Sequence, residues 1–320
     1  MWIVDSPTTP ILVPCAIALG NFDGIHSGHQ TVLAPILNAR RECDAYPTVV
    51  TFTPHPREFF TGEKRALLTP VAEKIEILEK LGIEQLVLLP FTAEMAALSP
   101  AEFVDRIIVE KLQAKSISVG EDFHFGHRRA GSATDLATLS ERFGIRTRIV
   151  PLKNCRDCSI DPSARVSSSL IRQALAGGDV ERARQMLGRP YRLIGRVVRG
   201  QQLGRTLGFP TANLELPGDK LLPRFGVYSA RVSIDSEEPI AAVMNIGCRP
   251  TVDGSGVTVE VHLLDWSGEL VDRTLSISLV SFLRPEQKFN SLDELKNQIA
   301  RDCLRARESL AIDRGNGIFE

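Results

Sequence analysis

The stretch Gly20-Asn-Phe-Asp-Gly-Ile-His-Ser-Gly-His29 decides the fold of the first part of this chain. An apolar run over residues 11–19 precedes it and is typical of a buried strand, whereas residues 29–37 show a helical pattern. The glycines between them supply a flexible turn. We therefore expect a strand, a loop and a helix in this order, with His26 and His29 at the start of the helix.

This position suits a phosphate-bearing ligand. A helix N-terminus presents unpaired backbone N–H groups and the positive end of the helix dipole, so it favours a bound anion. Because His26 and His29 stand at such a place, a nucleotide is the first ligand to consider. The competing interpretation is a turn histidine followed by a histidine that only caps the helix.

The bulk properties indicate an ordinary globular protein of two domains. The chain has 320 residues, of which 43% are hydrophobic and 24% charged. We expect a cytoplasmic protein without a membrane partner, because no apolar run reaches the roughly 18 residues that span a bilayer and the N-terminus does not resemble a signal peptide. The formal charge of −1 argues against a general nucleic-acid partner, although seven arginines and no acidic residue occupy residues 182–205. That cluster suits phosphates or forms a solvated face.

The six cysteines are scattered along the chain without the density of a disulfide scaffold. Cys155 and Cys158 form the one closely spaced pair. Zinc would need two further ligands, and a redox pair would begin a helix in a thioredoxin-like unit. We therefore expect an ordinary loop at Cys155 and Cys158.

Strand and helix patterns alternate in the first half of the chain, which favours a doubly wound parallel sheet. The expected strands cover residues 47–52, 85–89 and 116–119, and the expected helices cover residues 70–81 and 101–112. Thr69 is expected to cap the first of these helices, and Ser99 with Glu102 to form a capping box on the second. The ligand crevice of such a sheet lies beyond the carboxyl ends of its strands.

The second half is rich in strands and predicts a small antiparallel β-barrel. The expected strands cover residues 191–198, 226–234, 240–246, 257–264 and 274–283. A final helix begins at the capping box formed by Ser291 and Glu294 and is expected to pack on the barrel. We place the domains at residues 1–186 and 187–320.

The stretch Ser167-Ser-Ser-Leu-Ile-Arg172 brings hydroxyls, backbone donors and a guanidinium together at a helix start, although a serine N-cap explains it equally well. Together with residues 20–29, 52–56 and 120–126, it makes the first domain similar to FAD synthetases (FMN adenylyltransferases), which are members of the HxGH nucleotidyltransferase superfamily with a Rossmann-like fold. The resemblance implies an ATP site and a neighbouring flavin site. The implied ATP-site residues are Asn21, Asp23, Gly24, His26, His29, Ser168 and Arg172, with His26 and His29 catalytic and in contact with the phosphates. The implied flavin-side residues are Asp122 and Phe125, and Phe125 could equally belong to the core.

The second domain opens with a glycine-rich run, residues 195–208, followed by Phe209-Pro-Thr-Ala-Asn213. The glycines let the backbone approach a ligand closely, and Thr211 and Asn213 offer oxygen donors suited to a hard cation. Residues 207–213 resemble the riboflavin kinase signature, and residues 226–228, 245–251 and 259–265 agree with that family. The resemblance implies a Mg²⁺-ATP site, a general base and a flavin or phosphate contact. These residues are Gly195, Gly204, Thr211 and Asn213 for Mg²⁺-ATP, Glu260 as the base, and Arg284 as the contact.

Glu260 alternates with Val259 and Val261, so on a strand its side chain faces away from theirs. The resemblance makes it the group that takes a proton from the ribityl 5′-hydroxyl of riboflavin. The combined expectation is an enzyme that phosphorylates riboflavin to FMN and adenylylates FMN to FAD, with ATP as co-substrate in both steps. The alternatives are an adenylyltransferase for another acceptor, and a flavin-binding carrier or sensor with one inactive domain. The oligomeric state is left open.

Overall fold

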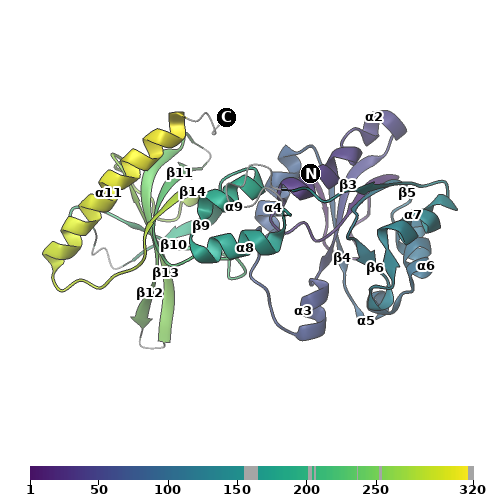
Figure 1. The fold of residues 1–320 in the computed structure, drawn as a ribbon, viewed down its shortest axis with the longest axis horizontal. Helices are drawn as coiled ribbons and strands as arrows, with labels where there is room; N and C mark the ends of the chain where they lie inside the picture. Colours follow the sequence, from purple (N-terminus) through teal and green to yellow (C-terminus); the bar gives the residue numbers. More distant parts are fainter. Residues whose placement is uncertain (155–164, 201–203, 205–206, 236, 252–253, 316–320) are drawn as a thin grey trace. The chain divides into compact units, whose positions relative to one another are not determined.

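The computed structural model describes residues 1–154, 165–200, 204, 207–235, 237–251 and 254–315 (Figure 1). Cys155 and Cys158 lie outside these residues. The chain forms two compact units, Met1–Ser168 and Ser169–Glu320. Two helices, α8 (Ser168–Gly177) and α9 (Val180–Leu187), fall almost entirely in the second unit. The domain boundary between residues 186 and 187 stays a prediction.

The first unit is built on a six-stranded, wholly parallel sheet in the order β1-β4-β3-β2-β5-β8. Its strands are β1 (Trp2–Val4), β2 (Cys15–Leu19), β3 (Tyr46–Thr53), β4 (Gln85–Pro90), β5 (Ala114–Gly120) and β8 (Arg146–Val150). A separate ribbon pairs β6 (His124–Phe125) with β7 (Gly131–Ser132). The predicted doubly wound sheet is confirmed. Strands β3 and β4 follow on one side of β2, and β5 and β8 lie on the other, so the strand order reverses at β2. A crevice for ligands is expected at such a reversal.

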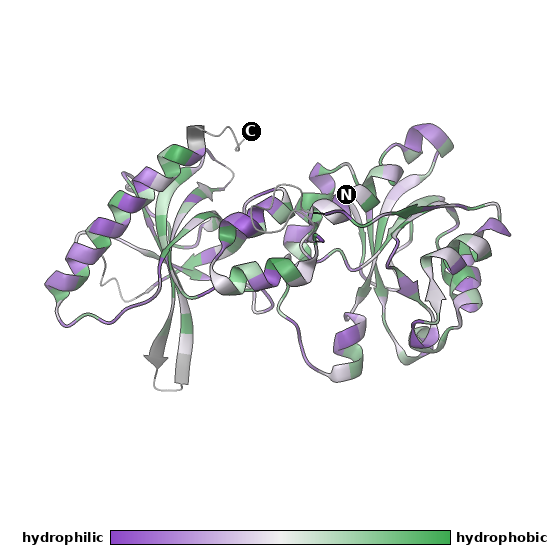
Figure 2. Ribbon diagram, viewed as in Figure 1, coloured by the Kyte–Doolittle hydropathy of each residue, from purple (hydrophilic) through white to green (hydrophobic). Residues whose placement is uncertain are grey.

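Helices cover the sheet and pack on both of its faces. They are α1 (Ser27–Leu33), η1 (Ala34–Ile36), α2 (Ala39–Cys43), α3 (Pro56–Thr61), α4 (Val71–Lys80), α5 (Ala93–Ala97), α6 (Pro100–Phe103), η2 (Val104–Lys111), η3 (His127–Arg129) and α7 (Ala133–Glu141). Strand β2 is buried throughout, with Ile17 and Leu19 in one core cluster and Ala16 and Ala18 in the other. This two-sided burial explains its continuous apolar run. Figure 2 shows the same apolar colouring along the central strands.

Several sequence expectations hold, and others need correction. The capping box of Ser99 and Glu102 is present. Thr69 does not cap α4, because Pro70 is the N-cap and the Thr69 hydroxyl bonds the loop after β2 instead. The strand expected over residues 11–19 begins only at Cys15, since Pro14 has no N–H to give to a ladder. Strands β1 and β8 were not predicted: β1 has three residues, and β8 is largely polar.

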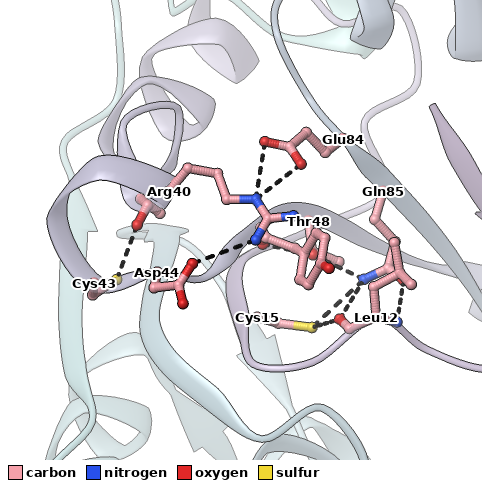
Figure 3. Close-up of polar contacts among 10 residues, drawn as sticks. Leu12, Cys15, Arg40, Cys43, Asp44, Thr48, Glu84 and Gln85 are labelled. Atoms are coloured by element: carbon pink, nitrogen blue, oxygen red, sulfur yellow. Dashed lines mark hydrogen bonds and ion pairs between the residues drawn. The ribbon is translucent and has the colours of Figure 1, made fainter.

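A buried glutamine takes the place of strand pairing before β2 (Figure 3). The Gln85 side chain is fully buried, accepts a bond from Leu12 N at 2.7 Å and donates to Leu12 O and Thr48 Oγ1, each at 3.1 Å. Burial raises the pKa of the neighbouring Cys15 thiol to about 11, so this thiol stays protonated and donates to Leu12 O. One amide thus ties the chain entering β2 to β3 and β4.

The second unit is a closed antiparallel barrel in the order β10-β13-β12-β11-β14-β9. Its strands are β9 (Arg192–Val198), β10 (Ala212–Glu215), β11 (Gly226–Ile234), β12 (Ile240–Thr251), β13 (Gly254–Leu263) and β14 (Thr274–Arg284). The predicted barrel is confirmed. The short strand β10 was not predicted, although it closes the barrel by pairing with both β9 and β13.

Three helices pack against this barrel. Helix α11 (Leu292–Gly315) covers Val227 and Val243 with Cys303 and Ala306, as the sequence predicted, and Figure 2 shows its mixed hydropathy. Ser291 Oγ accepts a bond from Glu294 N at 3.1 Å at its start. Helix α9 packs on β14, and Leu175 O of α8 accepts a bond from Arg224 N at 2.8 Å.

We predict that Gln85→Met lowers the free energy of unfolding of the first unit by about 1–3 kcal/mol, because it leaves buried backbone groups of Leu12 without their bonds. Urea unfolding of a Trp266→Phe background checks this, since Trp2 then reports the first unit alone. The exposed Gln113→Met is the matched control. Equal midpoints for the two variants would contradict the prediction.

Candidate active sites

The loop between β2 and α1 turns sharply at the point where the strand order reverses. Phe22, Gly24 and Ile25 have φ angles of 47°, 90° and 40°, in the left-handed region. The side chains of Phe22 and Ile25 are buried, at 1% and 0% exposure. Their burial offsets the cost of the backbone conformation and fixes the path of the loop.

Asp23 holds this loop to the segment before α4. Its buried carboxylate oxygen Oδ1 accepts bonds from Leu68 N at 2.8 Å and Thr69 N at 3.2 Å. In return, Gly24 N donates to Thr69 Oγ1 at 2.9 Å. The Ser168 hydroxyl, within the same unit, donates to Asp23 O at 2.8 Å. Asp23, Gly24 and Ser168, all predicted in the nucleotide site, thus meet in one network.

His26 and His29 lie together at the N-terminus of α1. His26 is the N-cap, and its Nδ1 accepts a bond from His29 N at 3.2 Å. The two rings stack with centroids 3.6 Å apart, and the Phe22 ring meets His29 edge-on at 5.2 Å. A Cβ on Gly28 would lie 3.2 Å from the His26 ring, which explains the glycine between them. Because Nδ1 of His26 accepts, its proton in the neutral ring is on Nε2, which makes Nε2 a donor.

A lysine that sequence reasoning missed contacts this loop from α4. Lys74 is 7% exposed, and its Nζ donates to Asn21 O at 3.1 Å. Thr51 Oγ1 donates to the same carbonyl at 3.3 Å. Burial lowers the pKa of Lys74, and the Asp23 carboxylate opposes that shift. Its place early in the predicted helix over residues 70–81 did not indicate burial, because a lysine on a helix is ordinarily solvated.

Aromatic side chains gather near the carboxyl ends of β3 and β4. Phe91 makes edge-on contacts with Phe52, Phe59 and Phe60 at centroid distances of 5.6, 5.3 and 5.9 Å. Phe60 is 70% exposed and Phe59 is 38% exposed. The resemblance included residues 52–56, but the sequence pattern did not predict these contacts, which we call the aromatic cluster.

The predicted flavin-side residues of this unit have partners within the protein. Phe125 is buried in the core and packs on Phe103 and Phe123. Asp122 forms an ion pair with Arg165. Arg172, which was predicted in the ATP site, lies on α8 in the second unit.

In the barrel, register aligns a carboxylate between two carboxamides. Glu260 of β13 is the direct partner of Asn213 on β10 and of Asn245 on β12. Its neighbours Val259 and Val261 are buried at 4% and 1% exposure, whereas Glu260 is partly exposed. Glu260 therefore faces away from the barrel interior, as its alternation with the valines predicted.

Glycines lie directly against the two predicted metal donors. A Cβ on Gly204 would lie 3.0 Å from Thr211 Oγ1, and one on Gly200 would lie 2.0 Å from the Asn213 amide. His262 Nδ1 donates to Pro210 O at 2.8 Å and so fixes the turn before Thr211. Gly195 faces Glu215 O, which a Cβ would approach to 2.7 Å. Close packing of β9 on β10 thus accounts for Gly195.

Several arginines of the second unit form ion pairs with carboxylates of the same unit. Arg284 Nη2 bonds Asp302 Oδ2 at 2.8 Å, and its Nε bonds the same carboxylate, which is 2% exposed. In the arginine-rich segment, Arg184 pairs with Asp313 at 2.6 Å and Arg196 with Asp272 at 2.8 Å.

The described residues contain no group of three His, Cys, Asp or Glu side chains that could hold a metal ion. Over the same residues, no helix has the length and apolar character to span a membrane.

Comparisons with known proteins match both units. A family model for FAD synthetase matches residues 9–164, and one for riboflavin kinase matches residues 187–310. A bifunctional riboflavin kinase/FMN adenylyltransferase of Pseudomonas fluorescens is 41% identical over 92% of each chain. The protein of that name in Escherichia coli K12 is 38% identical over 94% of each chain.

A crystal structure of a protein named macrolide-efflux protein, from Streptococcus pneumoniae, superposes with a TM-score of 0.83 at 30% identity, covering 95% of this chain and 98% of that one. The two family matches and the relatives agree on two linked activities. The chain belongs to the family of bifunctional riboflavin kinase/FMN adenylyltransferases and makes FMN from riboflavin and FAD from FMN.

Proposed function

We propose that each activity has its own site, with adenylyl transfer at the loop after β2 and riboflavin phosphorylation beside Glu260. The stacked His26 and His29 at the N-terminus of α1 carry the first assignment. The alignment of Asn213, Glu260 and Asn245 carries the second. The expected cytoplasmic location, and the expected absence of nucleic-acid and membrane partners, stay predictions.

In the adenylyl step, a phosphate oxygen of FMN attacks the α-phosphorus of ATP. A new P–O bond forms, the bond to the β-phosphate oxygen breaks, and pyrophosphate leaves with the negative charge. The positive end of the α1 dipole favours the polyphosphate at this place. His26 Nε2–H and the His29 ring stabilise the charge that develops on the leaving group. Ser168, whose hydroxyl donates to Asp23 O, is proposed to close over the phosphates, and the role of Arg172 at the phosphates stays a prediction.

In the kinase step, Glu260 accepts the proton of the ribityl 5′-hydroxyl, whose oxygen then bonds the γ-phosphorus of ATP while ADP leaves. Thr211 Oγ1 and Asn213 Oδ1 are neutral oxygen donors of the kind that Mg²⁺ accepts beside substrate phosphates. Gly200 and Gly204 pack closely against these side chains, and the two oxygens fit the ion by their donor chemistry. Mg²⁺ bound there would neutralise charge on the phosphates.

For the flavin of the adenylyl step we propose the aromatic cluster in place of the buried Phe125. An isoalloxazine ring needs an accessible aromatic face, and Phe59 and Phe60 have one. They lie at the carboxyl edge of the sheet, as does the loop after β2. Asp122 and Arg284 stay predicted flavin or phosphate contacts. Each already forms an ion pair within the protein, with Arg165 and Asp302 respectively, and a ligand would compete with that ion pair.

Paired variants test the two sites. We predict that His29→Ala lowers FAD formation from supplied FMN by at least about 100-fold and leaves FMN formation within twofold. Glu260→Gln should do the reverse, because it removes the proposed base and keeps the shape. Chromatography of the products of riboflavin, Mg²⁺ and ATP measures both.

The exposed His124→Ala and Glu269→Gln are the matched controls for these two variants and should keep both activities. Full FAD formation by His29→Ala would refute the first assignment. Full FMN formation by Glu260→Gln would refute the second.

We further predict that Phe60→Ala raises the KM for FMN in adenylyl transfer about 10-fold, the equivalent of about 1.4 kcal/mol, because an aromatic contact is lost. The KM for ATP should stay unchanged. Phe143→Ala, which removes a ring that is 49% exposed in the same unit, is the control. A wild-type KM for FMN in Phe60→Ala would place the flavin elsewhere.

A further inference from the structure

Lys74 is a buried charge that neither proposed reaction uses. It lies in the second turn of α4 with only 7% of its surface exposed, although lysines are almost never buried without a partner. Its Nζ donates to the carbonyl oxygen of Asn21 at 3.1 Å. Asn21 is the second residue of the loop that ends at His26. A buried ammonium therefore contacts the loop from α4.

This contact adds to the hydrogen bonds that residues 68–74 make with the loop after β2. Leu68 N and Thr69 N bond the Asp23 carboxylate, and Thr69 Oγ1 accepts from Gly24 N. Lys74 adds a contact to Asn21, one residue before Phe22 with its left-handed φ. Asn21, Asp23 and Gly24 are therefore each held from the same stretch, residues 68–74. Without Lys74, the first part of the loop would keep only the longer bond from Thr51 at this carbonyl.

The charge of Lys74 also matters for an anion. The carboxylate of Asp23 faces it from the loop, His55 lies near both at the N-cap of α3, and the buried Glu73 precedes it on its own helix. Burial lowers the pKa of the Lys74 ammonium, and Asp23 favours the charged form. In a low-dielectric surrounding, a positive charge attracts a nearby anion more strongly than it would in water.

We propose that Lys74 is a positioning residue for adenylyl transfer, which holds the Asn21 carbonyl so that the loop after β2 keeps the conformation that receives the ATP polyphosphate. This inference rests on the proposed role of His26 and His29. Lys74 acts through the loop, so its loss weakens ATP binding more than it slows the chemical step.

The test compares Lys74→Met with Lys74→Arg in the full chain. Methionine keeps the length and apolar stem but removes the charge and donor, whereas arginine keeps both. We expect Lys74→Met to raise the KM for ATP in adenylyl transfer at least about 10-fold, with a smaller fall in kcat, and Lys74→Arg to recover most of that loss. Riboflavin phosphorylation in the same chain is the internal control, and the exposed Lys80→Met of the same helix is the matched control.

A pH profile gives a readout that a merely structural role would not move. As the pH rises through the lowered pKa of Lys74, the ammonium is lost, so the wild-type KM for ATP should rise on the alkaline side. Burial lowers the pKa of His55, so this ring has already lost its proton in that range and does not contribute. Lys74→Arg stays charged and should lack this rise.

Thermal unfolding first establishes that each variant is folded. A wild-type KM for ATP in folded Lys74→Met overturns the inference, as does an identical alkaline rise in wild type and Lys74→Arg; the latter comparison decides the matter if Lys74→Met does not fold. If His29→Ala abolishes FAD formation while Lys74→Met does not impair it, only this inference fails. Full FAD formation by His29→Ala would instead remove the proposed function on which it rests.

Discussion

The loop after β2, where we propose adenylyl transfer, depends on the two hydrogen bonds that the Asp23 carboxylate accepts from backbone N–H groups. They fix a loop that passes through left-handed φ angles at Phe22, Gly24 and Ile25, which would otherwise be costly. Bonds between a buried carboxylate and backbone amides are strong for hydrogen bonds in proteins, because the acceptor is charged. The rest of the site follows from that loop, since it sets where α1 begins and therefore where the His26 and His29 rings stack.

The two units meet the same problem, a polyphosphate, with different backbone geometry. In the first, the sheet order reverses at β2, and α1 begins directly after the loop that follows β2. In the second, the strands close into a barrel, and glycines lie against Thr211 and Asn213. We propose that the parallel sheet supplies its phosphate site through its topology, whereas the barrel supplies one through the glycines that lie against Thr211 and Asn213.

Sequence patterns predicted the parts of this fold that are determined locally. The strand predicted over residues 226–234 matches β11 (Gly226–Ile234). Glu260 faces outward, as predicted, because successive side chains of a strand point to opposite faces of the sheet. Edge strand β8 escaped prediction because its Arg146-Thr-Arg start is polar, and β10 because four residues carry little periodicity. Thr69 was misassigned as a cap because the same hydroxyl chemistry serves a distant loop.

Residue type also proved a weak guide to which charged and aromatic side chains are available for ligands. Phe125 and Phe60 are chemically identical, yet one is buried and the other is 70% exposed, and only tertiary packing decides between them. Arg284 is engaged by the carboxylate of Asp302, which is 2% exposed, and removing Arg284 would leave that carboxylate as a buried charge without its ion-pair partner. Its guanidinium is therefore held to α11 before any phosphate arrives. Lys74, which the sequence presents as an ordinary helical lysine, is instead the cation that the fold places against the nucleotide loop.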